Sequence, residues 1–207
     1  QLPLDNTNLI SRAYKLMRSE VDSVESEYVV HLKKVIPLGS GLGGGSSNAA
    51  FTLKALNELW KLNYSPNKLE ILSVQLGADV PFFIRGGFQL AEGIGEKLTP
   101  QNDHFLRGLH FLLIIPPFYI STDEAYQSLN KSLRPIENQS IFAPVSKSVN
   151  WQLFDNDFEK VIRKAYPEIG DIKENLQGAG ALHAGLSGSG STVFGVFDNL
   201  KAAKLIR

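Results

Sequence analysis

Residues 36–50 are Ile36-Pro37-Leu38-Gly39-Ser40-Gly41-Leu42-Gly43-Gly44-Gly45-Ser46-Ser47-Asn48-Ala49-Ala50. Five of the seven residues from Gly39 to Gly45 are glycine, so the backbone is free to adopt positive φ angles and to approach a ligand without obstruction by a Cβ atom. An apolar-striped segment follows, from Ala49 to Leu62, and predicts a helix. The N-terminus of a helix attracts anions through its free N–H groups and its dipole. The stretch therefore predicts a phosphate-binding loop that leads into a helix.

The segments on either side of this loop predict a strand and a buried helix. Residues 28–36 are mostly apolar and predict a strand that enters the loop. The helix after the loop has apolar residues on most of its circumference and only a narrow polar edge of Lys54, Glu58 and Lys61. We therefore expect an exposed loop on a mostly buried helix, which would give a phosphate site rigid support.

Three alternative interpretations of the loop agree less well with its residues. Residues 39–44 match the dinucleotide fingerprint formally, but that motif also requires an acidic residue about 20 positions later, after a second strand. The nearest acidic residue, Glu58, falls within the predicted helix. A P-loop requires lysine after its last glycine, and no lysine occurs between Lys34 and Lys54. A simple flexible turn does not account for Ser46-Ser47-Asn48, which follow the glycines at a helix start.

Composition excludes several classes of protein. The 207 residues suffice for one large or two small domains. The 21 basic and 21 acidic residues balance, which argues against a broad nucleic-acid or membrane surface. The chain has no cysteine, so disulfides, thiolate nucleophiles and Cys-based zinc sites are excluded. No apolar run approaches the roughly 18 to 20 residues of a membrane span. This composition is compatible with a cytoplasmic protein, or with a plastid protein if the source is plant-like.

The loop resembles the phosphate-loop signature of the GHMP kinases, Pro-x-x-x-Gly-Leu-Gly-x-(Gly)-Ser-Ser-x-Ala. Two more stretches resemble signatures of that family and occur in its order: residues 76–83, Leu-Gly-Ala-Asp-Val-Pro-Phe-Phe, and residues 185–192, Gly-Leu-Ser-Gly-Ser-Gly-Ser-Thr. Within the family, the sequence is most similar to the branch that phosphorylates a hydroxyl of a cytidine-diphosphate-linked methylerythritol in non-mevalonate isoprenoid biosynthesis. That small molecule is the partner the resemblance implies; nucleic acid and membrane are not expected, and the oligomeric state is left open.

The resemblance implies an α+β protein with the GHMP kinase fold. Residues 1–107 would form a βαβ-rich N-terminal, ATP-binding domain and residues 108–207 a ferredoxin-like C-terminal domain. Kinases of this type begin with a strand that carries a Lys-x-Asn-like motif, and no such motif precedes Asp5. The last residues look like an unfinished helix. We therefore expect the first strands to lie upstream and the C-terminal domain to be cut short; 207 residues alone should bind ATP weakly and turn over little.

The resemblance implies ATP and Mg²⁺ as cofactors. The triphosphate would be held by residues of the glycine loop and the helix start, namely Gly39, Gly41, Leu42, Gly43, Gly44, Gly45, Ser46 and Ser47. Ser46 or Ser47 is a possible Mg²⁺ ligand, although no metal ligand is certain. Asn8 and Leu9 match a pair that lies against the adenine, but Asn8 is equally well explained as the cap of a helix that runs to Arg18. Lys34 could reach the nucleotide or, as a strand lysine, face water.

Asp79 is the candidate catalytic residue. On the residues alone, a carboxylate directly after Gly77-Ala78 and before an apolar stretch is expected to cap a short helix. In the family, the matching aspartate is the proposed base that takes a proton from the acceptor hydroxyl. The two roles are compatible.

Five residues are candidates for substrate binding: Thr122, Tyr126, Gly188, Ser189 and Gly190. Thr122 lies in a predicted capping box at residues 121–124, and Tyr126 lies in the first turn of the helix that this box opens. Tyr126 is either an ordinary half-buried tyrosine or the aromatic ring that the family stacks on cytosine. The last three lie in the third signature, which alone predicts a hairpin loop; in the family such a loop lines the acceptor and phosphate side.

Two other functions stay open. One is a different GHMP kinase, with homoserine or mevalonate as acceptor; the run Gly43-Gly44-Gly45 and the sequence around Asp79 argue against it. The other is a non-catalytic protein of the same fold that binds nucleotide. The presence of Asp79 argues against that, because a binding protein needs no base.

Overall fold

The computed structural model describes residues 3, 5–23, 28–130, 151 and 154–206. They form two compact units, of which the first comprises Gln1–Leu38 and Gly43–Asn102. The second comprises Gly39–Leu42 and Asp103–Arg207. The glycine loop is therefore divided, with its first four residues grouped with the later part of the chain. The two domains expected from the sequence, 1–107 and 108–207, stay a prediction.

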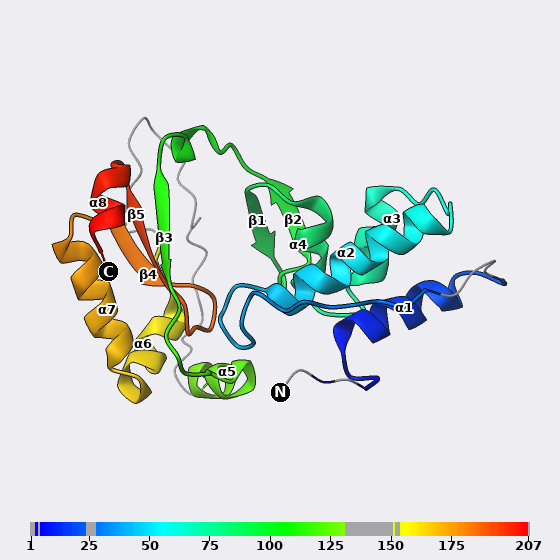
Figure 1. Cartoon of the computed structure of the whole chain (residues 1–207), viewed down its shortest axis with the longest axis horizontal. Coiled ribbons are helices and arrows are strands. Elements are labelled where there is room, and N and C mark those ends of the chain that lie inside the picture. The colour runs from blue at the N-terminus through cyan, green and yellow to red at the C-terminus, as the bar shows by residue number, and fades with distance from the viewer. Residues whose placement is uncertain (1–2, 4, 24–27, 131–150, 152–153, 207) are drawn as a thin grey trace. The chain divides into compact units, whose positions relative to one another are not determined.

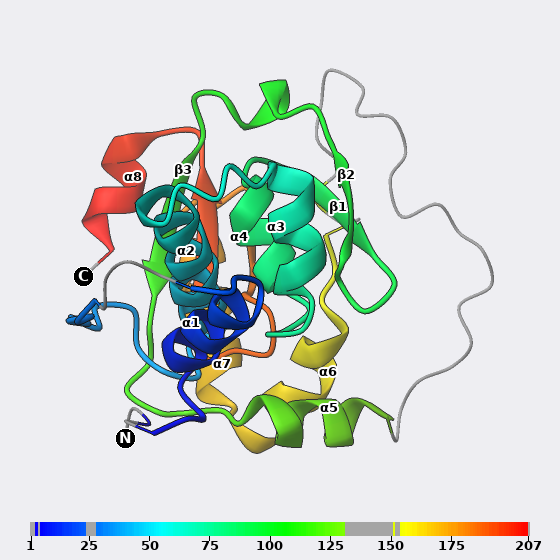
Figure 2. The ribbon, with the colours of Figure 1, turned by 90° about the vertical axis from the view of Figure 1, so that its right-hand side faces the viewer.

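The first unit is built mainly from four helices: α1 (Leu9–Ser19), α2 (Gly44–Leu59), α3 (Pro66–Ser73) and α4 (Val80–Arg85). Figure 2 shows α1 alongside α2, and α2 and α3 both contact α4. Their facing side chains form one apolar core that contains Ala13, Met17, Ala49, Ala50, Leu53, Leu56, Leu69, Leu72, Leu76, Val80 and Ile84. The core therefore fixes α2, the helix that follows the glycine loop.

Helix caps explain where α1 and α3 begin. The Asn8 side-chain oxygen accepts a hydrogen bond from the backbone N–H of Ile10, at 2.9 Å, and satisfies a donor that the helix itself leaves free. The Ser65 hydroxyl accepts from the N–H of Lys68, and Pro66 occupies the first helical position, where its missing N–H costs nothing. The helix cap that the sequence predicts at Asn8 is confirmed.

Helix α2 differs from its prediction in two ways. It begins at Gly44, so Gly44, Gly45, Ser46 and Ser47 form its first turn and are not loop residues. One face is fully buried, but Phe51 and Leu59 are largely exposed, as is Ala55. The helix is therefore half-buried, because α1 and α4 cover one side of it and the described residues leave the other side open.

The predicted strand at residues 28–36 is absent from the described structure: the segment is extended but forms no sheet. A strand requires a hydrogen-bonded neighbour, and no described segment pairs with these residues. Val29 is accordingly 84% exposed. The expected βαβ arrangement is also not found among the described residues, because the sheet of this unit is the antiparallel pair β1 (Gln89–Glu92) and β2 (Lys97–Pro100).

The second unit holds a three-stranded antiparallel sheet in the order β3-β5-β4. The strands are β3 (His110–Ile114), β4 (His183–Leu186) and β5 (Val193–Phe197), and the short helix η1 (His104–Leu106) precedes them. The register pairs Leu112 with Gly195 and Ala184 with Gly195. Strand β3 has one exposed face and one that packs on the core: Phe111 and Leu113 are exposed, while Leu112 and Ile114 contact the core.

Four helices complete this unit: α5 (Thr122–Asn130), α6 (Asp157–Ala165), α7 (Glu168–Gly178) and α8 (Leu200–Leu205). Helices α7 and α8 lie against the sheet (Figure 1), and α6 contacts β4, α5 and α7. Ile169, Leu176, Val193 and Phe197 are at the centre of the core between helices and strands. The α+β class predicted from the sequence is confirmed. No helix of the described ranges has the length and apolar character that crossing a membrane requires.

The α2 helix offers a matched test of this packing. Leu53 is fully buried and Leu59 is 50% exposed. Leu53→Ala should lower the free energy of unfolding by about 2–5 kcal/mol, because it leaves a cavity in the core. Leu59→Ala should lower it by less than about 1 kcal/mol. Urea denaturation of both variants measures the difference, and equal losses would contradict the assignment of the buried face.

Candidate active site

The start of α2 presents free backbone N–H groups. Gly43 occupies the N-cap position in the left-handed conformation, with φ of 62°, and supplies no side-chain cap. The first intrahelical bond runs from the Ser47 N–H to the Gly43 carbonyl at 2.8 Å. A Cβ atom on Gly43 would lie 2.7 Å from the Phe83 ring of α4. The positive φ angle and this contact both require glycine at position 43.

The ammonium group of Lys34 lies directly beside this helix start. Its Nζ atom is 2.7 Å from the position that a Cβ on Gly44 would take. The expected exposure of the glycine loop is found only in part, because Ser40 of the loop is buried, as is Gly44 at the helix start. Partial burial lowers the pKa of Lys34, because desolvation disfavours its charged form. A cation and the positive end of a helix dipole thus meet at one point, and an anion bound there would interact favourably with both.

Asn8 and Leu9 lie close to the same helix start. The Leu9 Cδ1 atom is 3.3 Å from the position of a Cβ on Gly45. Asn8 lines a cavity of about 490 Å³ between α1 and the extended segment. Its other lining residues include two tyrosines and a lysine: Asn6, Ile10, Ser11, Tyr14, Lys15, Tyr28, Val30 and Leu32. This volume lies in the range of small-ligand sites.

In the second unit, the first half of the glycine loop packs on the loop between β4 and β5. The backbone N–H of Ser191 donates to the Gly39 carbonyl at 3.2 Å, and that of Thr192 donates to the Ser40 carbonyl at 3.1 Å. The Ser187 hydroxyl donates to the Gly41 carbonyl at 2.9 Å. The first and third glycine-rich signatures are therefore brought together, although 146 residues separate Gly41 from Ser187.

The packing against the β4–β5 loop requires glycine at position 41. A Cβ on Gly41 would lie 2.0 Å from the Ser187 carbonyl oxygen, and φ at Gly41 is 72°. Only glycine permits this backbone approach. At Gly39, φ is 60° and the nearest neighbour is the exposed ring of Tyr119, so the positive φ angle is the stronger reason for glycine there. Gly188 and Gly190 also have positive φ angles, so both loops are built from left-handed turns.

The remaining substrate candidates group around the start of α5. The hydroxyls of Thr122 and Ser189 are 3.4 Å apart. Tyr126 lies one turn along from Thr122 and is 52% exposed, with one edge-to-face contact to Phe158 at a ring distance of 4.9 Å. The exposed part of the ring is free for a planar ligand.

Asp79 occupies the N-cap position of α4 but makes no side-chain cap hydrogen bond. Its side chain is exposed. Its Oδ1 atom is 3.7 Å from the position of a Cβ on Gly95, in the β1–β2 turn, so the absence of a side chain there leaves space beside the carboxylate. The position of Asp79 agrees with the predicted cap, while the carboxylate itself is not used for capping.

The described residues contain no group of three or more His, Asp or Glu side chains that would hold a metal ion. The hydroxyls of Ser46 and Ser47 lie in the first turn of α2. Mg²⁺ commonly binds through one or two protein ligands together with substrate phosphates. These donors therefore fit a Mg²⁺ ion that arrives with a nucleotide.

Three residues of these sites were not predicted from the sequence. Tyr119 covers Gly39, Phe83 covers Gly43, and Asn156 bonds to the β4–β5 loop. The Asn156-Asp157 pair before an apolar stretch is a recognisable helix-start signal. No sequence signal connects any of the three to its distant glycine loop.

Comparison with known proteins decides the family. Residues 8–87 match the GHMP kinases N terminal domain, and residues 143–207 match the GHMP kinases C terminal domain. A protein of Chlorobium phaeobacteroides is 41% identical over 98% of this chain and 70% of its own length; its name is 4-diphosphocytidyl-2-C-methyl-D-erythritol kinase. The chain belongs to the GHMP kinases. A protein of Bacteroides thetaiotaomicron with the same name is 43% identical over 92% of this chain and 68% of its own length.

Two solved GHMP kinase structures are similar to this chain with the same TM-score, 0.74. A 4-(cytidine 5'-diphospho)-2C-methyl-D-erythritol kinase is 29% identical and matches 99% of this chain and 74% of its own. The homoserine kinase of Cytophaga hutchinsonii is 21% identical and matches 100% of this chain and 71% of its own. The GHMP kinase fold predicted from the sequence is thus confirmed, but backbone similarity alone does not separate the two acceptors.

The ammonium of Lys34 provides a test of the anion site. Lys34→Met should raise the Kd for ATP about tenfold or more, because a charge-assisted contact at the helix start is lost. Lys33→Met, which removes an adjacent exposed charge, should leave it unchanged. Titration calorimetry measures both.

The same measurement has a pH dependence. Lys34 is charged below its pKa, and burial lowers that pKa. ATP affinity should therefore fall as the pH rises, and the fall should begin at a lower pH than for an ordinary lysine. Lys34→Met should lack this alkaline limb. Equal affinities of the Lys33 and Lys34 variants would contradict the assignment.

Proposed function

We propose that this protein transfers the γ-phosphate of ATP to a hydroxyl of 4-diphosphocytidyl-2-C-methyl-D-erythritol. One observation supports this proposal most directly. The Lys34 ammonium lies beside Gly44, at the start of α2, where no side chain caps the helix. Relatives about 40% identical over nearly the whole chain bear the name of this kinase, which supports the choice of acceptor.

Phosphoryl transfer depends mainly on positioning and on neutralising charge. The backbone N–H groups of Gly44, Gly45 and Ser46 would hold phosphate oxygens, and Lys34 would add a full positive charge to them. Mg²⁺ bound with the nucleotide would neutralise further charge, with Ser46 or Ser47 as its ligand from the chain. The cavity beside Asn8 would accept the adenine.

Asp79 is our candidate for the general base. It would accept the proton of the attacking hydroxyl, so that the oxygen gains electron density as it approaches phosphorus. An exposed carboxylate without a cap hydrogen bond is available for this transfer. The glycine at position 95 leaves room for an acceptor molecule beside it.

The α5 start and the β4–β5 loop would bind the acceptor. The open face of Tyr126 suits the cytosine ring. The paired hydroxyls of Thr122 and Ser189, together with the backbone of Gly188 and Gly190, would bind polar groups of the same molecule. A cytoplasmic location is part of this proposal.

The acceptor is tested by a coupled assay that supplies ATP with either 4-diphosphocytidyl-2-C-methyl-D-erythritol or homoserine. For the protein as it is made in the cell, we expect turnover with the first alone. Turnover with homoserine alone would instead indicate a homoserine kinase; the solved homoserine kinase structure is equally similar in fold. ATP binding without turnover of either acceptor would favour a non-catalytic nucleotide-binding protein.

Asp79 should contribute to chemistry more than to binding. Asp79→Asn keeps the shape and a cap oxygen but accepts no proton, so kcat should fall roughly 100-fold or more while the KM values change little. Asp103→Asn is the matched control, because Asp103 also occupies a helix N-cap without a side-chain cap bond. Normal turnover by the Asp79 variant would show that Asp79 is not the general base.

Tyr126 should discriminate between the two substrates. Tyr126→Ala should weaken binding of the cytidine substrate by about 1–3 kcal/mol, the usual contribution of base–aromatic stacking, and leave ATP affinity unchanged. Tyr126→Phe keeps the ring and should bind like the wild type. Fluorescence titration with each ligand measures this; a loss shared by both ligands would instead indicate a packing defect against Phe158.

A further inference from the structure

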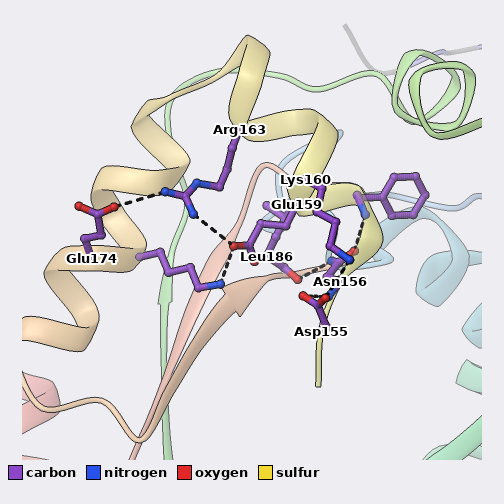
Figure 3. A network of polar contacts seen from close by, with 9 residues as sticks. Asp155, Asn156, Glu159, Lys160, Arg163, Glu174 and Leu186 are labelled. Atoms are coloured by element: carbon purple, nitrogen blue, oxygen red, sulfur yellow. Dashed lines mark hydrogen bonds and ion pairs between the residues drawn. The ribbon is translucent and has the colours of Figure 1, made fainter. Parts of the chain in front are cut away.

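Asn156 uses its whole side-chain amide to join a helix to a loop. Its Oδ1 atom accepts from the backbone N–H of Phe158 at 3.0 Å and so caps α6. Its Nδ2 atom donates to the Leu186 and Gly188 carbonyls, each at 2.8 Å. Figure 3 shows Asn156 at the start of α6, beside Leu186 at the end of β4. A cap alone would need only the oxygen, so the two donated bonds have a separate role.

Those two carbonyls flank Ser187, the residue that anchors the β4–β5 loop to the phosphate loop. Ser187 donates to Gly41, while Ser191 and Thr192 donate to Gly39 and Ser40. Asn156 therefore holds the β4 end of a loop that is also bonded, through Ser187 at one end and Ser191 and Thr192 at the other, to residues 39–41. The loop is fixed at both ends.

The helix that carries Asn156 is itself held firmly. Glu159 is buried and forms an ion pair with Lys173 of α7. Arg163 lies between Glu159 and Glu174, at 3.9 and 3.3 Å (Figure 3). A buried charge that loses its partner is costly, so this network resists movement of α6 relative to α7.

The same helix supports the proposed cytosine-binding ring. Phe158 lies two residues after Asn156 and makes the edge-to-face contact with Tyr126. One rigid helix start thus supports the Tyr126 ring and the loop that contains Ser189. The acceptor groups of this unit depend on it.

We propose that Asn156 is a positioning residue that holds the β4–β5 loop in place for phosphoryl transfer. It touches neither substrate and acts through the carbonyls of Leu186 and Gly188. The expected effect of Asn156 on kcat rests on the proposed function, whereas its expected effect on the position of the β4–β5 loop does not. A displacement of about 1 Å at a transfer site lowers the rate roughly 100-fold, whereas binding of ATP at α2 should be unaffected.

Asn156→Ser separates the tether from the cap. Serine is as good an N-cap residue as asparagine but lacks the two amide N–H groups. We expect kcat to fall about 10- to 100-fold, with the KM for ATP within twofold of the wild type. Asn199→Ser is the control, because Asn199 caps α8 in the same way without contacting the loop. A kcat of the Asn156 variant equal to that of the control would overturn the proposal.

Asn156→Asp gives an independent result if the serine variant folds poorly. As a cap alone, aspartate should match or improve stability, because a negative charge is favourable at a helix start. As a tether, its carboxylate would donate nothing and repel two carbonyl oxygens. We therefore expect a lower kcat than in the serine variant, and wild-type kinetics would contradict the tether.

Hydrogen exchange separates this proposal from the proposed function. In ligand-free protein, the amides of Ser191 and Thr192 should exchange about tenfold faster in both Asn156 variants than in the Asn199 control, because the loop loosens from residues 39–41. If no variant, including the wild type, phosphorylates the cytidine substrate, the function fails and faster exchange still supports the tether. Unchanged exchange in both variants would refute it.

Discussion

The close approach of two backbones is the constraint on which the second unit depends. The Gly41 Cα lies so near the Ser187 carbonyl that a single methyl group would overlap it. Three hydrogen bonds then join residues 39–41 to residues 187–192. Because these bonds come from the main chain and from one short hydroxyl, the geometry tolerates little variation. Glycine at position 41 is therefore needed for close packing of the two backbones, in addition to its conformational freedom.

The sequence was informative wherever the decisive contact is local. The cap at Asn8 and the helix that follows the glycine loop can be predicted from neighbouring residues. The strand expected at residues 28–36 fails for the opposite reason, since an extended segment becomes a strand only beside a partner. The exposure of Phe51 on α2 and of Phe111 on β3 likewise depends on what covers each face, which periodicity does not report.

The candidate site shows the same division. Lys34 could be proposed because it precedes the loop by a few residues, but its place at Gly44 depends on how the chain turns at Leu38 and Gly39. Tyr119 meets Gly39 across 80 residues of sequence, and Asn156 meets Gly188 across 32. Such contacts are specified by the packing of the whole unit. Local sequence patterns therefore identify the glycines but not the side chains that pack against them.

The left-handed glycine that opens α2 has a thermodynamic consequence. Most helices complete their first turn with a serine, threonine, aspartate or asparagine side chain, whereas Gly43 has none to offer. In the proposed function, a bound phosphate group would take the place of that cap. Folding of the first unit and occupancy of its ligand are then linked equilibria, and the apparent stability of that unit rises with the logarithm of ligand concentration above its dissociation constant. The level of nucleotide in the surroundings would set how much of the protein is held in its folded form.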